Sequence, residues 1–226
     1  MSNITILMVD DHTIVREGLR KLIELDRELS VIGEASDGRS AVEMAVKLRP
    51  NVVIMDIAMP RLNGLAATRQ LLKLQPAAKI LILSAHADES YIKGALEAGA
   101  KGYLLKQASM EEFSHAIRSV HEGKPFFSIH VPGSPADTNT RPSARLRIQG
   151  ATKLQLTSRE MEILQLVAEG MANKAMAVEL NIAIKTVEKH REHLMLKLGI
   201  HDTAGLTRYA ISSGIIENST QDTTKT

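Results

Sequence analysis

The first 120 residues alternate between short apolar runs of strand length and amphipathic segments of helix length. The runs that we predict to be strands are residues 4–9, 30–35, 51–56, 79–84 and 101–105. The segments that we predict to be helices are residues 13–25, 38–48, 64–74, 88–98 and 109–121. Five strand–helix units in succession favour an open parallel sheet with helices on both faces. We therefore predict an α/β domain whose five-stranded parallel sheet has the flavodoxin-like order 2-1-3-4-5.

A different pattern begins after Gly123. The next segment holds four prolines among glycine, serine, threonine and arginine, a composition typical of a linker. Beyond it the pattern is purely helical and opens with Thr157-Ser158-Arg159-Glu160, which has the form of a capping box. The helices predicted there are residues 157–168, 173–180, 184–198 and 203–212. The predicted organisation is a domain over 1–123, a linker over 124–152, an all-α four-helix domain over 153–216 and a disordered polar tail over 217–226.

The composition restricts the class of protein. Hydrophobic residues make up 44% of the chain and charged residues 24%, as in soluble globular proteins. No apolar stretch reaches membrane-spanning length and the N-terminus lacks the basic region of a signal peptide, so we expect a cytoplasmic protein with no membrane partner. The absence of cysteine excludes disulfides, thiolate metal sites and cysteine nucleophiles. Residues 141–215 carry eleven Lys and Arg against seven Asp and Glu, which fits a polyanionic partner.

Acidic residues end two of the predicted buried strands. Asp10 and Asp11 close the first strand, and Asp56 closes the third. In this strand order both ends border the crevice where ligands bind in open α/β sheets. Three carboxylates there favour a hard divalent cation such as Mg²⁺. Ser84 and Lys106 end the next two strands, where a hydroxyl and an ammonium group can hold phosphoryl oxygens.

Each of these residues alone has a simpler explanation. An aspartate at a strand end is usually a helix N-cap or a turn residue, and Asp11 fits that role. A single serine such as Ser84 would be a loop hydroxyl, and a single lysine such as Lys106 would be a solvated charge. Their joint occurrence at four strand ends argues for a common site.

The same residues carry a family resemblance. Over about residues 4–121 the chain resembles the receiver domain of two-component response regulators. The motifs that match are Val9-Asp10-Asp11-His12, Asp56-Ile57-Ala58-Met59-Pro60 with Gly64, Leu83-Ser84-Ala85, and Lys101-Gly102-Tyr103-Leu104-Leu105-Lys106. The resemblance implies a flavodoxin-like receiver in which Asp56 accepts a phosphoryl group from a sensor histidine kinase.

A set of metal ligands follows from this resemblance. It implies that Asp11 and Asp56 bind Mg²⁺ directly, that the backbone carbonyl of Ala58 assists, and that Asp10 acts mainly through water.

The resemblance also assigns the residues that respond to phosphorylation. It implies that Ser84 hydrogen-bonds the new phosphoryl oxygens, that Lys106 pairs with them, and that Tyr103 moves inward with Ser84. Phosphorylation adds roughly −1.5 to −2 charge and strong acceptors, so these groups would have to move toward the modified aspartate.

The third C-terminal helix has one apolar and one charged face. If Val187 faces the domain core, Leu194 and Leu198 lie on the same face of a helical wheel. The side chains that then project outward are Lys185, Glu188, Lys189, Glu192 and Leu196. Lysine and glutamate on an exposed helix can read base edges in DNA. The alternative is a solvated surface helix with ordinary ion pairs.

A second resemblance favours DNA. Residues 155–215 look like the four-helix LuxR-type helix-turn-helix domain. The matching residues are Leu156-Thr157-Ser158-Arg159-Glu160, Ala168-Glu169-Gly170, Asn173-Lys174, Lys185-Thr186-Val187-Glu188-Lys189-His190 and Lys197-Leu198-Gly199. It implies that helix 184–198 enters the major groove. The implied base-reading residues are Lys185, Glu188, Lys189 and Glu192. The implied phosphate contacts are Asn173, Lys174, Thr186, His190 and Arg191.

Together the two resemblances indicate a NarL/FixJ-type response regulator. We expect a phosphorylation-dependent transcriptional regulator that binds double-stranded promoter DNA and is a homodimer when active. Ala204, Leu206 and Ile211 of the last helix are the expected dimerisation face, with a core-facing role as the alternative. One rival is a regulator whose activity does not depend on phosphorylation. An aspartyl phosphatase is a further rival, but such enzymes typically separate the two acids after the first strand by one residue.

Overall fold

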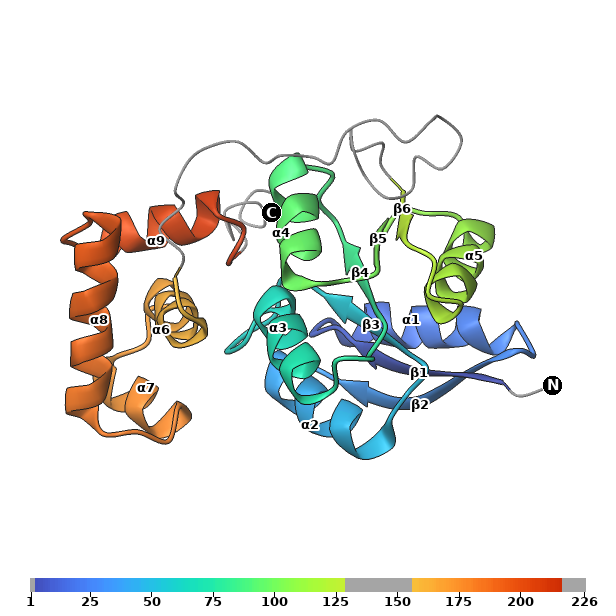
Figure 1. Ribbon diagram of the computed structural model, residues 1–226, viewed down its shortest axis with the longest axis horizontal. Coiled ribbons are helices and arrows are strands. Elements are labelled where there is room, and N and C mark those ends of the chain that lie inside the picture. The colour runs from blue at the N-terminus through green and yellow to red at the C-terminus, as the bar shows by residue number, and fades with distance from the viewer. Residues whose placement is uncertain (1–2, 129–155, 217–226) are drawn as a thin grey trace, which may run out of the picture.

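The structure is a computed structural model that describes residues 3–128 and 156–216 (Figure 1). The N-terminal strands are β1 (Ile4–Val9), β2 (Leu29–Ala35), β3 (Val52–Asp56), β4 (Ile80–Ser84), β5 (Gly102–Leu105) and β6 (Phe126–Phe127). The helices between them are α1 (Thr13–Glu24), α2 (Gly38–Leu48), α3 (Gly64–Leu74), α4 (Glu89–Ala98) and α5 (Met110–His121). The predicted strand–helix alternation is therefore confirmed, and no end of a predicted element is shifted by more than one residue.

The sheet has one strand more than predicted. Its order is β2-β1-β3-β4-β5-β6 and every pairing is parallel, so the predicted order is confirmed for the first five strands. The sixth strand pairs Phe126 and Phe127 with the first two residues of β5. Its two rings pack against opposite faces of the sheet. A two-residue strand beside a proline has no readable periodicity, so the sequence pattern places these residues in the linker.

The sheet continues to Phe127, beyond residue 123 where the first domain is predicted to end. The rest of the predicted linker and the predicted tail lie outside the described residues.

Each face of the sheet is covered by its own set of helices. Apolar residues of α2, α3 and α4 pack on one face against side chains such as Leu7 and Met55. Residues of α1 and α5 pack on the other face against side chains such as Ile6 and Ile54. Neighbouring residues of one strand thus point to opposite faces, as the two-residue period of a strand requires.

The C-terminal domain contains α6 (Ser158–Ala168), α7 (Asn173–Glu179), α8 (Ile184–Leu198) and α9 (Thr203–Ser212). Apolar residues from all four helices form one core. Among the described residues, no helix is long and apolar enough to cross a bilayer.

The predicted capping box at the start of α6 is confirmed. Thr157 Oγ1 accepts a hydrogen bond from Glu160 N at 3.2 Å, and Glu160 Oε2 accepts one from Thr157 N at 2.8 Å. The same carboxylate pairs with Lys197 Nζ at 2.7 Å and so ties α6 to the end of α8. Burial opposes ionisation of Glu160, but the bonds from Lys197 and Thr157 outweigh it and lower the pKa of this carboxyl.

We expect Glu160→Ala to lower the free energy of unfolding of the C-terminal domain by about 2 kcal/mol or more, because the variant loses the cap and the ion pair together. Glu160→Gln keeps an acceptor for Thr157 N and should lose less. Urea denaturation followed by circular dichroism measures both. A loss below about 0.5 kcal/mol for the alanine variant would show that the capping box contributes little.

Helix α6 lies between the rest of its own domain and the N-terminal domain (Figure 1). Residues 162–167 of α6 are all buried, although a helix with only one packed face would alternate buried and exposed positions. One side of α6 contacts α8 and α9, and another contacts α3. Figure 1 shows α8 on the side of the C-terminal domain that faces away from the N-terminal domain.

Candidate functional site

The predicted acidic residues gather at one edge of the sheet. Asp10 and Asp11 follow β1, and Asp56 is the last residue of the neighbouring β3. Ligand atoms from these three residues and from His12 all lie within 4.8 Å of one another. Asp10 and Asp56 are buried, with 1% and 3% of their surfaces exposed, whereas Asp11 is half-buried. The strand ends thus bring the three carboxylates together as the sequence predicts.

Lys106 supplies the opposite charge in this cluster. Its Nζ lies 2.9 Å from Asp56 Oδ2 and 2.8 Å from Asp10 Oδ2. The other oxygen of Asp56, Oδ1, accepts a hydrogen bond from Ile57 N at 2.8 Å. A buried carboxylate needs such partners, because an unpaired charge in a low-dielectric site is costly.

Burial dominates the protonation of Asp56. Removal from water raises the pKa of Asp56 to about 6, and the nearby Asp10 charge adds to this effect, while Lys106 opposes it. The same carboxylates act in the other direction on the lysine: burial favours neutral Lys106, but Asp56 and Asp10 outweigh burial and raise its pKa. The fold alone therefore stabilises the ionised form of Asp56 less well than water does.

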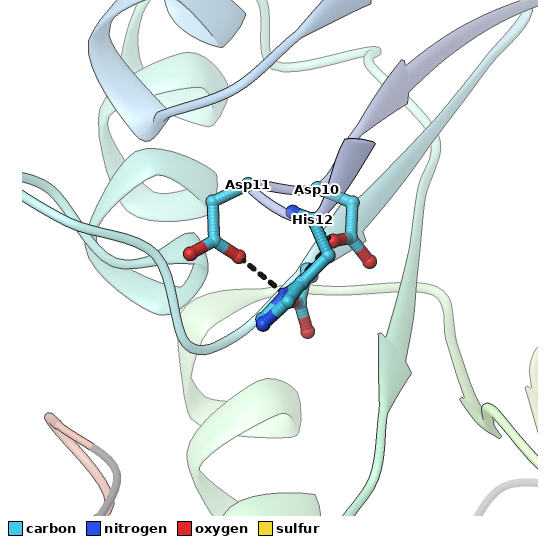
Figure 2. Close-up of side chains that lie close together, drawn as sticks. Asp10, Asp11 and His12 are labelled. Carbon is cyan, nitrogen blue, oxygen red and sulfur yellow. Dashed lines mark hydrogen bonds and ion pairs between the residues drawn. The ribbon is translucent and has the colours of Figure 1, made fainter. Parts of the chain in front are cut away.

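Sequence reasoning gave no role to His12, which belongs to this cluster. Its Nδ1 lies 2.9 Å from Asp11 Oδ1 and 3.4 Å from Asp10 Oδ1 (Figure 2). Its backbone N donates to Asp10 Oδ1 at 2.8 Å. The backbone bond orients the carboxylate of Asp10, while the exposed ring contacts Asp11.

The donor set of the cluster fits a hard divalent cation. Carboxylate oxygens are the ligands that Mg²⁺ prefers. Asp10 Oδ2 and Asp11 Oδ1 are inaccessible to water, and among the described residues each has one polar contact, to Lys106 Nζ at 2.8 Å and to His12 Nδ1 at 2.9 Å. A carboxylate oxygen with a single such partner keeps a lone pair for another ligand. Unsatisfied acceptor capacity of this kind is what a cation would use. Ala58, half-buried, lies two residues beyond Asp56 on the same loop.

Ser84 and Tyr103 lie on the next two strands. Ser84 ends β4, is 1% exposed, and its Oγ accepts a hydrogen bond from His86 N at 3.1 Å. Tyr103 on β5 is fully buried and its hydroxyl donates to the His86 carbonyl at 2.6 Å. Burial raises the pKa of Tyr103 to about 12, so the hydroxyl stays a donor. The ring is already inside in this conformation, so the inward movement expected from the sequence is not needed here.

The predicted recognition helix presents the predicted face. Lys185, Glu188, Lys189 and Glu192 of α8 are all exposed, whereas Val187 on the opposite face is fully buried. The helical wheel is thereby confirmed. Figure 1 places α8 itself on the side of the C-terminal domain away from the N-terminal domain.

The residues predicted to hold phosphates divide into two groups. Lys174 is exposed, and Thr186 and His190 are half-buried. Arg191 is held by its neighbours, because Nη1 donates to Asn173 Oδ1 at 2.6 Å and Nη2 to Thr203 Oγ1 at 3.3 Å. These two bonds join α8 to the starts of α7 and α9.

Not all three residues of the expected dimerisation face of α9 are accessible. Leu206 is fully buried in the domain core and cannot face a second copy in this conformation. Ala204 is exposed and Ile211 is half-buried. For Leu206 the alternative, core-facing role is the one observed.

Sequence reasoning missed the residues that join the two domains. Gln165 of α6 is only 1% exposed and bonds to the loop between β3 and α3, and Glu162 of α6 bonds to Gln70 of α3. A signal was present, since Gln165 interrupts the apolar run of residues 163–167. A buried polar side chain in such a run needs a hydrogen-bonding partner from elsewhere in the molecule.

Comparison with known proteins gives a consistent result for both domains. Residues 6–118 match the family model for the response regulator receiver domain, and residues 154–210 match that for bacterial regulatory proteins of the luxR family. The transcriptional regulatory protein LiaR of Bacillus subtilis is 39% identical over 210 residues, covering 92% of this chain and 96% of LiaR. DegU of Brevibacillus brevis is 32% identical over 227 residues, covering 96% of each chain.

A solved structure agrees over nearly the whole length. The two-component response regulator RcsB in complex with DNA has a TM-score of 0.60 and 25% identity, covering 92% of this chain and 98% of RcsB. Both sequence relatives are named as transcriptional regulators, which excludes the phosphatase alternative. The chain therefore belongs to the response regulators that join a receiver domain to a LuxR-type DNA-binding domain, and it is a transcriptional regulator of a two-component system.

Proposed function

We propose that Asp56 is the phosphoacceptor. A carboxylate oxygen of Asp56 attacks the phosphorus of a phosphohistidine on a sensor kinase, an O–P bond forms, the N–P bond breaks, and the histidine leaves with its electron pair. The observation that supports this assignment is the arrangement of Asp56, buried at the sheet edge with Lys106 Nζ 2.9 Å from its oxygen. Lys106 orients the carboxylate before the reaction and stays close enough to pair with the phosphoryl group afterwards.

Asp10, Asp11, Asp56 and the Ala58 carbonyl would hold Mg²⁺. When bound, this cation neutralises negative charge on the oxygens of the transferring phosphoryl group. The side chains themselves contribute the acceptor oxygens, of which Asp10 Oδ2 and Asp11 Oδ1 each have a single polar contact among the described residues. Lys106 meanwhile limits the repulsion among the carboxylates.

The response to phosphorylation would begin at Ser84 and Lys106. A phosphorylated Asp56 presents strong acceptors and roughly −1.5 to −2 charge. Ser84 Oγ, which now accepts from His86 N, would turn to donate to a phosphoryl oxygen. Because Tyr103 also bonds to the His86 backbone, the loop after β4 would move together with both side chains.

The output of this regulator is DNA binding by α8. Its exposed lysines and glutamates can read bases, while Lys174, Thr186 and His190 are placed to contact phosphates. The DNA complex of the similar protein RcsB supports this role. A homodimer on two half-sites about one helical turn apart would place two copies of α8 in successive major grooves.

Intact mass spectrometry tests the acceptor directly. Incubation with acetyl phosphate and Mg²⁺ should add one phosphoryl mass to the wild-type chain and none to Asp56→Asn. The control Asp88→Asn changes an aspartate outside the cluster and should gain mass like the wild type. No gain on the wild type would contradict the assignment, and would leave a regulator that works without phosphorylation.

Lys189→Ala should weaken binding to a specific site by about tenfold to a hundredfold and affect non-specific binding much less, because a lost base contact removes discrimination. The matched control is Lys174→Ala, which should weaken both kinds of binding alike and lower the salt slope by about one. Fluorescence anisotropy at several salt concentrations measures these quantities. A uniform loss for Lys189→Ala would make Lys189 a phosphate contact.

A further inference from the structure

The loop that follows Asp56 contacts the DNA-binding domain through its backbone. Gln165 Nε2 donates to the Met59 carbonyl at 2.9 Å, and Gln165 Oε1 accepts from Asn63 N at 2.8 Å. Gln165, Met59 and Asn63 are all buried. One side chain thus satisfies a donor and an acceptor of residues 57–63, which connect β3 to α3.

A second contact joins the same region to the segment after α9. Asn63 Nδ2 donates to the Ile215 carbonyl at 3.2 Å, while its Oδ1 caps α3. The adjacent Gly214 lies against the ring of Tyr91 on α4, so closely that a Cβ at Gly214 would lie 2.6 Å from a ring carbon. Tyr91 stacks on His86, whose backbone bonds to Ser84 and Tyr103.

Glu169 also contacts the β3–α3 loop, because Arg61 N donates to Glu169 Oε1 at 3.1 Å, but both groups are exposed. Further contacts between the domains lie outside the two loops. Lys73 Nζ bonds to Ser158 Oγ at 3.1 Å, and Arg39 pairs with Glu179 at 3.4 Å. These pairs are partly open to solvent, so each contributes little. Gln165 is different, since its loss would leave a carbonyl and an amide buried and unpaired.

The β3–α3 loop is stiff enough to transmit a shift. Gly64 N donates to the Ile57 carbonyl at 2.9 Å and Gly38 N to the Leu62 carbonyl at 3.1 Å. Ala58, the proposed backbone ligand, is the immediate neighbour of Met59. A displacement of Ala58 therefore reaches the carbonyl that Gln165 holds.

We propose that Gln165 is a positioning residue through which the DNA-binding domain holds the β3–α3 loop, so that docking of the two domains and phosphorylation of Asp56 oppose each other. The inference rests on the proposed function of Asp56. We call the arrangement with the two domains in contact the docked state. In it Gln165 and Gly214 pack against the loops after β3 and β4 in the conformation that these loops have without a phosphoryl group. Phosphorylation draws Ser84, and with it the His86–Tyr91 stack, toward Asp56, and the fit against Gly214 is lost.

Lys185, Glu188, Lys189 and Glu192 of α8 are exposed while the two domains are in contact, so docking does not cover the base-reading residues. It fixes α6 and the segment after α9 instead. Docking would therefore limit the orientations in which the DNA-binding domains of two copies can bind DNA side by side. Thermodynamic linkage makes this coupling reciprocal: the factor by which a phosphoryl group at Asp56 weakens docking is the factor by which docking weakens the affinity for that group.

Gln165→Leu in the full-length chain tests this coupling. Leucine is compatible with the helix, but docking would now bury the Met59 carbonyl and the Asn63 amide without partners, whereas separated domains leave both to water. We expect a larger radius of gyration in solution scattering. We also expect beryllofluoride, a phosphoryl mimic, to bind about fivefold or more tightly in the presence of Mg²⁺ by calorimetric titration.

The matched control is Lys73→Ala, which removes a hydrogen bond from the same interface without touching either loop. It should match the wild type in both measurements. An unchanged beryllofluoride affinity for Gln165→Leu would overturn the coupling, and an unchanged radius would overturn the holding role of Gln165. If the wild type binds no beryllofluoride at all, the phosphoacceptor assignment fails and the coupling with it, while scattering still decides whether Gln165 holds the domains together.

Discussion

Gly64→Ala is expected to lower the free energy of unfolding of the receiver domain by about 3 kcal/mol or more. A Cβ at Gly64 would lie 1.9 Å from the carbonyl oxygen of Asp56 and 2.9 Å from its carbonyl carbon. Backbone atoms of a central strand cannot give way as a flexible side chain can. The β3–α3 loop would have to move away from Asp56, so phosphorylation by acetyl phosphate should also slow. Urea denaturation and the rate of mass gain measure the two effects.

Gly18→Ala is the matched control for this substitution. Gly18 lies within α1, and a Cβ there would meet no atom within 4 Å. Alanine in an open helical position should stabilise by about 0.5–1 kcal/mol. If the two variants changed stability alike, the close approach of Gly64 to Asp56 would not be a structural constraint.

Asp56→Asn is expected to stabilise the receiver by about 3 kcal/mol at about pH 8 without divalent cations. The folded protein raises the pKa of Asp56 from 3.8 to about 6, mainly through burial. Between these values the folded state binds more protons than the unfolded state, so the wild type loses stability as pH rises through this window. Asparagine resembles the protonated acid and avoids that loss. The difference should vanish below about pH 4, where both states of the wild type are protonated.

Urea denaturation in the presence of a chelator, repeated across this pH range, measures the difference. Glu43→Gln serves as a control because it neutralises an exposed carboxylate, and it should change stability by less than about 0.5 kcal/mol. Stabilisation by Asp56→Asn that was the same at every pH would show that ionisation of Asp56 is not its cause. Mg²⁺ should narrow the gap at high pH, since a ligand that binds only the folded wild type stabilises it.

Most of the receiver could be predicted from the sequence because its pattern is regular. Buried strands such as residues 52–56 are apolar runs, and the acids at their ends meet at one sheet edge whatever the details of packing. The outward face of α8 could be predicted for a similar reason. Val187 and Leu194 lie seven residues apart, close to two helical turns, and both are fully buried.

The features that escaped prediction depend on contacts between distant segments. Phe126 and Phe127 form a strand only because the edge of β5 is available to them. Gln165 is buried only because the backbone of residues 59–63 approaches it. His12 joins the acidic cluster through contacts of its ring with the side chains of Asp10 and Asp11. None of these has a periodic signature within its own segment, so local patterns could not supply them.

In the proposed function, the charge at Asp56 controls how much DNA the regulator binds. The most direct measurement is the affinity of the full-length chain for a DNA site selected from a random library, with and without acetyl phosphate and Mg²⁺. The wild type should bind about tenfold or more tightly with the phosphoryl donor, and Asp56→Asn should show one affinity under both conditions. Equal affinity of the wild type with and without donor, at a phosphorylation level verified by intact mass, would contradict the claim.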